Sequence, residues 1–209
     1  MRKLLPPVAD YLDVTMPMMD ALPPVRKQLL DPLSDFINQR LRAPTCRLVF
    51  ICTHNSRRSH ISQIWAQVAA YYYGLDHIET YSGGTEATAF HLNAVEAMRR
   101  SGLAVESTDD SSNPIYNVRF ASDQAGMRVF SKTYDDDANP KADFGAVMTC
   151  SHADENCPVV FGAAKRISLH YEDPKEADGT SEVRRVYDER VRQIATELMY
   201  VMKNVKARP

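Results

Sequence analysis

Hydrophobic and polar positions in residues 46–203 follow two alternating spacings. A short continuous apolar run at 47–51 has the pattern of a strand buried on both faces. Apolar side chains then recur at helical spacing through 59–74. The same succession predicts further strands at 78–81, 146–149 and 166–170, and further helices at 92–101 and 181–203. Strands that alternate with helices predict an α/β fold, with a four-stranded parallel sheet as the middle of three αβα layers.

Residues 105–142 depart from this pattern. Two strand-like segments at 115–120 and 127–134 flank the turn-forming residues 122–126, which predicts a β-hairpin inserted at the edge of the sheet or over its mouth. Three consecutive aspartates at 135–137 follow. We expect a solvated acidic turn there, with a metal-binding loop as the alternative.

Residues 1–44 differ again, because they hold seven of the 12 prolines. Apolar residues recur at helical spacing from Val25 to Leu41, so a helix is predicted that begins at Asp20 or Pro24 and ends before Pro44. Pro32 predicts a kink or a break within it. The chain therefore divides into a helical arm at 1–44 and a domain at 45–209. The arm is expected to pack on that domain or on a second copy, which makes a homodimer possible.

Composition narrows the possible functions. The 209 residues are 44% hydrophobic and 25% charged, as in an ordinary globular domain. A net charge of −2 gives no basic field for nucleic acid or a membrane surface, and no apolar run approaches the ~20 residues of a membrane span. Prolines and aspartates interrupt the first residues, so no export signal is expected and the predicted location is the cytoplasm. The four cysteines, at 46, 52, 150 and 157, are then expected to be reduced.

The strongest chemical signal is the segment Cys-Thr-His-Asn-Ser-Arg-Arg-Ser at 52–59, which follows the first strand and opens the first helix. A loop of this length can curl until its backbone N–H groups point into one concavity that holds an anion. The helix directs its positive N-terminal end at the same place. Arg58 can close the ring with two parallel hydrogen bonds to an oxyanion.

The same loop favours a nucleophilic sulfur at Cys52, because the field that attracts an anion also stabilises a thiolate. Ser59 is placed to donate a hydrogen bond to this sulfur, and Asn55 to hold the loop in shape. The alternative is a buried cysteine at the end of a strand, beside a surface arginine. The predicted oxyanion-binding residues are Thr53, His54, Asn55, Ser56, Arg57, Arg58 and Ser59.

These residues resemble the low-molecular-weight tyrosine phosphatase superfamily, and more closely its thioredoxin-coupled arsenate reductases. Two further segments carry the resemblance. Thr149 to Pro158 is similar to the segment with the second and third redox cysteines of the reductases, and His170 to Pro174 is similar to the segment with the general acid. The resemblance implies an enzyme whose catalytic residues are Cys52, Arg58, Asp173, Cys150 and Cys157.

The resemblance implies a cascade for arsenate reduction. Cys52 attacks arsenic, Cys150 attacks Cys52 and releases arsenite, and Cys157 then takes over the disulfide, which thioredoxin or a similar dithiol reduces. No tightly bound cofactor and no metal are implied. If 150–157 were helical, its ends would lie about 10.5 Å apart along the axis. The Cα atoms of a disulfide approach to within about 7 Å, so this segment must unwind on oxidation.

Four positions depart from the family pattern. His54 stands where glycine is usual, and Arg57 where a cysteine is common. Gln63 stands where many reductases have an acidic residue linked to a potassium site. Lys175 follows the Asp-Pro pair, where tyrosine phosphatases tend to place an aromatic residue.

Three functions remain open at this stage. The first is arsenate reduction, the second is phosphomonoester hydrolysis by a protein tyrosine phosphatase, and the third is a non-catalytic module that binds oxyanions. The redox cysteines have their own alternatives, which are simple packing or a zinc site formed by Cys150, His152, Cys157 and His170. Cys46 is expected to serve packing, and Glu172 is the nearest rival of Asp173 as the general acid.

Overall fold

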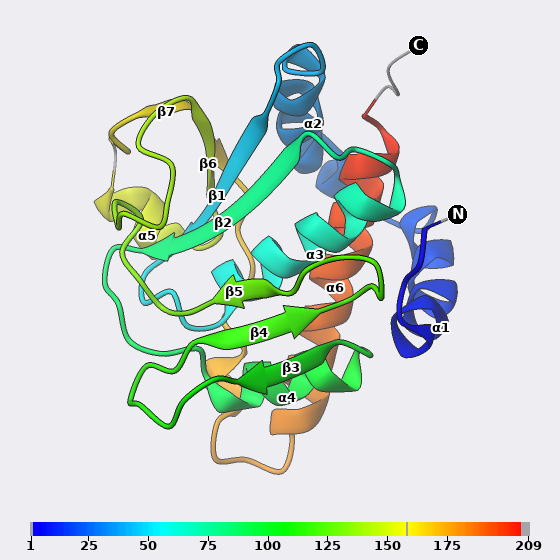
Figure 1. Ribbon diagram of the computed structural model, residues 1–209, viewed down its shortest axis with the longest axis vertical. Helices are drawn as coiled ribbons and strands as arrows, with labels where there is room; N and C mark the ends of the chain where they lie inside the picture. Colours follow the sequence, from blue (N-terminus) through cyan, green and yellow to red (C-terminus); the bar gives the residue numbers. More distant parts are fainter. Residues whose placement is uncertain (1, 158, 206–209) are drawn as a thin grey trace.

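A four-stranded parallel sheet organises the computed structural model, which describes residues 2–157 and 159–205 (Figure 1). Its strand order is β2-β1-β6-β7. The strands are β1 (Cys46–Cys52), β2 (Ile78–Gly84), β6 (Phe144–Met148) and β7 (Ala163–Ser168). The predicted α/β fold and its four parallel strands are confirmed, although β7 begins and ends earlier than predicted.

The two faces of the sheet bury different clusters of side chains. Alternate residues of β1 point to opposite faces, so Leu48 and Phe50 join one cluster and Val49 and Ile51 the other. The first face carries α3 (Arg58–Tyr72), which packs on β1, β2 and α6 (Val183–Lys203). Among the described residues, the second face carries the short helix α5 (Ser151–Asn156) and neighbouring loops. The sheet therefore lies between a thick helical layer and a thin one.

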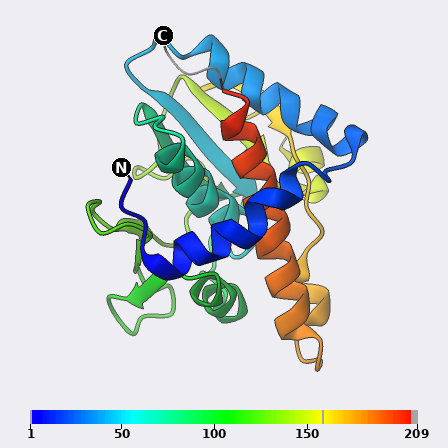
Figure 2. The same cartoon turned by 90° about the vertical axis from the view of Figure 1, so that its right-hand side faces the viewer.

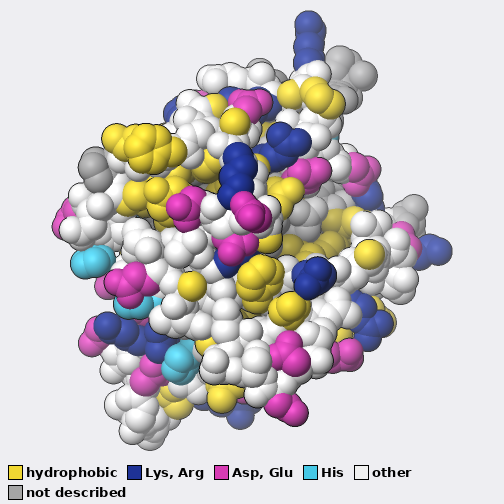
Figure 3. All heavy atoms as spheres, turned by 60° about the vertical axis from the view of Figure 1, so that its left-hand side comes forward, with side chains coloured by type: hydrophobic (Ala, Val, Ile, Leu, Met, Phe, Trp, Pro, Cys, Tyr) yellow, Lys and Arg dark blue, Asp and Glu magenta, His cyan; other side chains and the backbone are white. Residues whose placement is uncertain are grey.

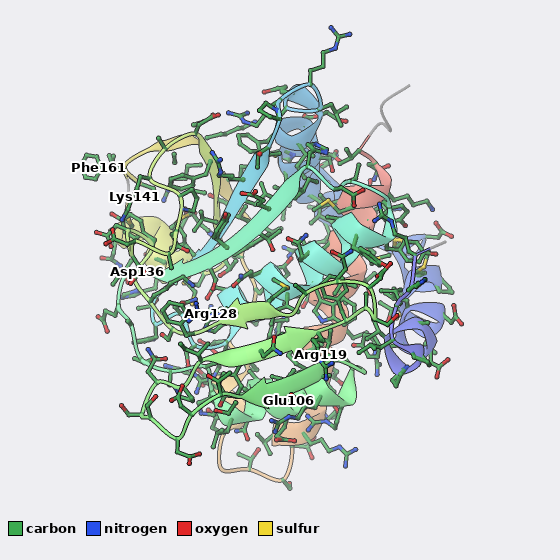
Figure 4. The ribbon with its side chains drawn as sticks, viewed as in Figure 1. Glu106, Arg119, Arg128, Asp136, Lys141 and Phe161 are labelled. Atoms are coloured by element: carbon green, nitrogen blue, oxygen red, sulfur yellow. The ribbon has the colours of Figure 1, made fainter. Side chains whose placement is uncertain are left out.

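The predicted insertion forms a small antiparallel sheet with the order β3-β4-β5. The hairpin strands are β4 (Tyr116–Arg119) and β5 (Met127–Val129), and β3 (Ala104–Ser107) adds a strand that the sequence pattern did not predict. Glu106 and Arg119 form an ion pair across β3 and β4, with 3.4 Å between carboxylate and guanidinium (Figure 4). Helix α4 (Leu92–Arg100) contacts β3 and α6.

The N-terminal residues pack on the body as α1 (Pro6–Thr15), the 3-10 helix η1 (Met16–Met19) and α2 (Pro24–Gln39). Figure 2 shows α1 crossing α6. Buried residues of both α-helices, such as Leu12 and Phe36, belong to the same hydrophobic cluster as α3 and α6. The homodimer through this arm remains a prediction.

Two prolines of the arm lie within helices. Pro32 lies inside α2, which runs on to Gln39, so the predicted break does not occur. Buried Leu30 and Leu33 on either side fix the helix to the core, and this packing outweighs the lost backbone hydrogen bond. Helix α1 begins at Pro6, where a proline is tolerated because the first N–H groups of a helix have no intrahelical acceptor.

Arg26 connects the arm to the body through a buried ion pair. Its Nε and Nη2 donate to the two carboxylate oxygens of Glu197 on α6, at 2.8 and 2.7 Å. Glu197 is only 1% exposed. The Arg26 guanidinium also lies over the ring of Tyr171, 5.0 Å from its centroid.

The surface carries acidic and basic side chains side by side on the face shown in Figure 3. Phe161, 78% exposed, projects from the loop before β7 (Figure 4). In the acidic turn, Asp137 pairs with Lys141 and Asp136 accepts from the N–H of Ala138. None of the helices described here is both long and apolar enough to cross a membrane.

Candidate active site

The carboxyl ends of the central strands bring the predicted residues to one edge of the sheet. Strand β1 ends at Cys52, Cys150 follows β6, and Asp173 follows β7. In parallel α/β sheets this edge is where ligands bind. It gathers segments that lie about a hundred residues apart in the sequence.

Asn55 fixes the loop between β1 and α3. Its φ of 44° lies in the left-handed region, which asparagine tolerates better than most residues. Its side-chain Nδ2 donates to Ser59 Oγ at 2.8 Å, and its Oδ1 accepts from the N–H of Lys132 at 2.9 Å. Gly84 backs the loop so closely that a Cβ there would lie 2.7 Å from the Asn55 nitrogen. The loop shape thus depends on both residues.

Cys52 is the buried sulfur at the base of this loop, 3% exposed. Its Sγ lies 3.1 Å from Ser59 Oγ, which already accepts from Asn55 and so has its proton free for the sulfur. The backbone N–H groups of residues 54–57 donate no hydrogen bond to any described part of the chain. The helix α3 begins at Arg58, immediately after them. This arrangement can hold an oxyanion in front of a thiolate.

Arg58 is held by the segment that carries the candidate acid. Its Nη2 donates to Asp173 Oδ2 at 2.7 Å, and its Nη1 donates to the Tyr171 carbonyl at 3.0 Å. Its Nε is buried and has no hydrogen-bond partner among the residues described. Asp173 also accepts from the N–H of Lys175, where it caps the 3-10 helix η2 (Pro174–Ala177). The Nε–H group is therefore a donor that remains unused for a ligand.

Arg57 faces away from this arginine. It donates through Nε to Tyr187 Oη at 2.7 Å and through Nη2 to Asp178 Oδ2 at 2.8 Å. Burial would raise the pKa of Asp178, but hydrogen bonds from Tyr187 and Asn93 and the charge of Arg57 lower it. The Arg57 side chain thus ties Tyr187 and the segment around Asp178 to the loop.

The remaining predicted loop residues have distinct environments. The His54 side chain is about half exposed at the rim, with Nε2 3.7 Å from a Glu86 carboxylate oxygen. Its carbonyl accepts from the hydroxyls of Thr88 and Ser131, both at 3.1 Å. Ser56 Oγ donates to the carbonyl of residue 89 at 2.7 Å. These bonds hold the outer half of the loop.

Cys150 lies beside the loop. Its Sγ is 3.5 Å from Thr53 Oγ1, and it accepts from the N–H of Ala153 as the cap of α5. Thr53 Oγ1 is also 3.2 Å from His152 Nδ1. Cys157 ends the same helix, with its Sγ near the carbonyl of Val159. All four cysteines are buried thiols, and Cys52, Cys150 and Cys157 share one hydrophobic cluster.

Sequence reasoning missed the contribution of the insertion, since no local motif marks it. Ser131 and Lys132 follow β5 and hold the loop through His54 and Asn55. Lys132 is 5% exposed, with its ammonium 4.6 Å from the centroid of the Phe130 ring, and burial lowers its pKa to about 8. His60, on the first turn of α3, is also fully buried. Its Nδ1 contacts Ser82 Oγ at 3.1 Å, and desolvation lowers its pKa well below 6.5.

A resident potassium ion does not fit these residues. Gln63 offers a neutral amide, with Nε2 donating to the Thr80 carbonyl and Oε1 buried without a partner in the described chain. Lys132 lines the same 460 Å³ pocket, where its protonated ammonium repels a cation. The described residues also contain no group of three or more histidine, cysteine, aspartate or glutamate side chains arranged to hold a metal ion.

A family model and several known proteins are similar to this chain in sequence. Residues 47–122 match the family model described as "Low molecular weight phosphotyrosine protein phosphatase". An arsenate reductase of Halalkalibacterium halodurans is 32% identical over 155 residues, which cover 71% of this chain and 92% of the relative. An arsenate reductase of Bacillus subtilis is 32% identical over 145 residues, covering 69% of this chain and 86% of the relative.

Solved structures share the fold. A low molecular weight protein tyrosine phosphatase from T. tengcongensis superimposes with a TM-score of 0.52 at 15% identity, covering 76% of this chain and 99% of that one. A second phosphatase of this type, from Bacillus subtilis, gives the same TM-score and identity over 77% of this chain and 97% of that one. At this identity the likeness establishes the fold.

Proposed function

This chain belongs to the low molecular weight phosphotyrosine protein phosphatase family, together with the arsenate reductases that it resembles, and on that premise we propose that it reduces arsenate to arsenite. The proposed site residues are those at the carboxyl edge of the sheet. Arsenate is bound by the N–H groups of the loop at 53–59 and by Arg58. No tightly bound cofactor takes part.

The first step is an attack on arsenic. Cys52 enters as a thiolate, with Ser59 donating a hydrogen bond to the sulfur. Arsenic gains a bond to sulfur and loses one to oxygen. Asp173 protonates the departing oxygen, which leaves as water. This role requires Asp173 to release Arg58 when the oxyanion arrives, since the same carboxyl group pairs with it in the ligand-free protein.

The second step transfers electrons. The Cys150 sulfur attacks Cys52, the Cys52–Cys150 disulfide forms, and the electron pair of the sulfur–arsenic bond stays on arsenic, which leaves as arsenite. Cys157 then displaces Cys52 from Cys150. An external dithiol, thioredoxin or a protein like it, reduces the Cys150–Cys157 disulfide. We expect these reactions in the cytoplasm, where such dithiols keep cysteines reduced.

The observation that supports this proposal is the position of Cys150. Its sulfur contacts Thr53, the residue next to Cys52, and both sulfurs belong to the same buried cluster. Hydrolysis of a phosphoester needs only Cys52, Arg58 and Asp173. A buried second thiol beside the loop takes part in the reductase mechanism, whereas the hydrolase mechanism does not use it.

The experiment compares both chemistries on one preparation. Arsenate-dependent NADPH oxidation, coupled through thioredoxin and thioredoxin reductase, is measured beside hydrolysis of p-nitrophenyl phosphate. Cys150→Ser and Cys157→Ser are expected to abolish the first activity. Cys46→Ser is the matched control, because Cys46 is equally buried but lies at the opposite end of β1. Full arsenate turnover in Cys150→Ser would contradict the proposal.

Phosphomonoester hydrolysis is the second candidate, favoured by the family model that matches 47–122. Water would then cleave a phosphocysteine at Cys52. Strong phosphatase turnover that is unchanged in both cysteine variants, with no arsenate-dependent NADPH oxidation, would establish it.

A further inference from the structure

The side chain of His152 is connected to the candidate redox residue Cys150 through a chain of three polar atoms. Cys150 Sγ lies 3.5 Å from Thr53 Oγ1, and Thr53 Oγ1 lies 3.2 Å from His152 Nδ1. Cys150 is 1% exposed and Thr53 8% exposed, whereas His152 is exposed. The chain of contacts therefore leads from a buried thiol to a basic group at the surface.

A buried thiol needs a route by which its proton can leave before it can act as a nucleophile. The attacking species in disulfide chemistry is the thiolate, so Cys150 must lose its proton first. At 1% exposure it has little direct access to water. Its other polar neighbour is the Ala153 N–H, which donates to the sulfur and cannot take its proton.

We propose that His152 accepts the proton of Cys150 through the Thr53 hydroxyl, a role that rests on the proposed function. In the tautomer protonated on Nε2, His152 Nδ1 accepts the hydroxyl proton of Thr53, and the Thr53 oxygen accepts the thiol proton. The resulting Cys150 thiolate is stabilised by the Ala153 N–H. It attacks Cys52 Sγ, the S–S bond forms, and the S–As pair remains on arsenic. The proton ends on the imidazole and passes to water.

The environment of His152 suits this role. Imidazole is the side chain whose ordinary titration lies nearest to neutral pH, so it can take a proton and release it in each cycle. Asp154, on the same helix, is engaged by Ser168, His170 and Arg166. Asp154 is thus already paired, and His152 has no carboxylate partner in the part of the chain that the structure describes. The relay also adds a role for Thr53 besides anion binding.

The test isolates one step in a Cys157→Ser protein, where the cascade stops at Cys52–Cys150. The reduced protein is mixed with arsenate, quenched with acid at set times, and the disulfide is quantified by mass spectrometry of its peptides. His152→Ala and His152→Gln are each expected to slow the reaction roughly tenfold or more, since neither side chain can take a proton. Glutamine keeps a hydrogen-bonding side chain at this position. A slow rate in His152→Gln therefore shows that proton transfer is lost and not only the positioning of Thr53. Glu155→Ala, on the same helix, is the matched control.

Added imidazole provides the second measurement. It is expected to restore the rate of His152→Ala, because the site lies at the surface, and not that of Thr53→Val, which lacks the connecting hydroxyl. Equal rates with and without His152 would overturn the relay and leave the proposed function intact. Absence of the disulfide in the protein that retains His152 would overturn both.

Discussion

Arg58 and Asp173 form an ion pair of 2.7 Å at the mouth of the loop, so the group expected to bind the oxyanion is bound to the group expected to protonate the leaving oxygen. Both side chains are largely buried, at 13% and 21% exposed. An incoming dianion competes for the same guanidinium. It must displace the Asp173 carboxylate from Arg58 before it can occupy the guanidinium.

Asp173→Asn is therefore expected to change binding and turnover in opposite directions. Arsenate turnover falls roughly 10²–10⁴-fold, because the general acid is lost. Competitive inhibition by phosphate becomes stronger, because Arg58 no longer has an anionic partner. Steady-state kinetics with phosphate as inhibitor measure both quantities. The control is Glu172→Gln, the neighbouring carboxylate, for which neither change is expected. Weaker phosphate inhibition in Asp173→Asn would contradict this account of the pair.

The buried Arg26–Glu197 ion pair attaches the N-terminal arm to α6. Arg26→Met leaves a buried carboxylate without its partner, and we expect the free energy of unfolding to fall by roughly 3–5 kcal/mol. The double variant Arg26→Met/Glu197→Leu removes both charges and is expected to recover most of that loss. Urea unfolding followed by circular dichroism measures all three proteins. Additive losses in the double variant would contradict a buried pair.

Asp154 is expected to control how readily α5 opens. It accepts from Ser168 Oγ at 2.6 Å and contacts His170 Nε2 at 2.7 Å, which fastens the helix to the end of β7 and the segment after it. Cys150 and Cys157 flank this helix, so their disulfide requires it to unwind. Asp154→Ala is expected to speed hydrogen exchange of the α5 amides by roughly tenfold. This corresponds to a loss of about 1.4 kcal/mol from the free energy of opening the helix.

Hydrogen-exchange mass spectrometry measures this change on the reduced protein. Glu155→Ala serves as the control, because Glu155 is exposed on the same helix. Unchanged exchange in Asp154→Ala would show that other contacts hold the helix closed.

His60 predicts how stability depends on pH. Burial lowers its pKa in the folded protein well below 6.5, so the unfolded chain binds a proton that the folded protein does not. As pH falls below about 6.5, the free energy of unfolding should fall by up to about 1.4 kcal/mol per pH unit from this group. His60→Asn is expected to lack this contribution. Urea unfolding between pH 7.5 and 5 (roughly the range of histidine titration) compares the two, and parallel curves would contradict the prediction.

The sequence was sufficient to predict those helices and strands that a local pattern of apolar residues determines. The apolar run at 47–51 predicted β1, and the helical spacing after it predicted α3. The loop between them could be located because its residues are adjacent in the chain. Strand β3 was missed, since its four residues include only one buried side chain, Val105.

Contacts between distant segments could not be predicted in the same way. Nothing local to Lys132 indicates that its N–H holds Asn55, 77 residues earlier. Arg57 was predicted among the oxyanion-binding residues, but its side chain donates to Asp178, which lies 121 residues away. Likewise Pro32 signals a break in any isolated helix, and only the tertiary packing of its neighbours determines that α2 continues.

The most direct test of the central claim is a map of the cysteines after one turnover. The fully reduced protein is mixed with arsenate in the absence of thioredoxin, free thiols are alkylated, and the peptides are identified by mass spectrometry. We predict a disulfide between Cys150 and Cys157, with Cys52 and Cys46 alkylated. Four alkylated cysteines, in a preparation that hydrolyses p-nitrophenyl phosphate, would contradict the claim that this site is a reductase.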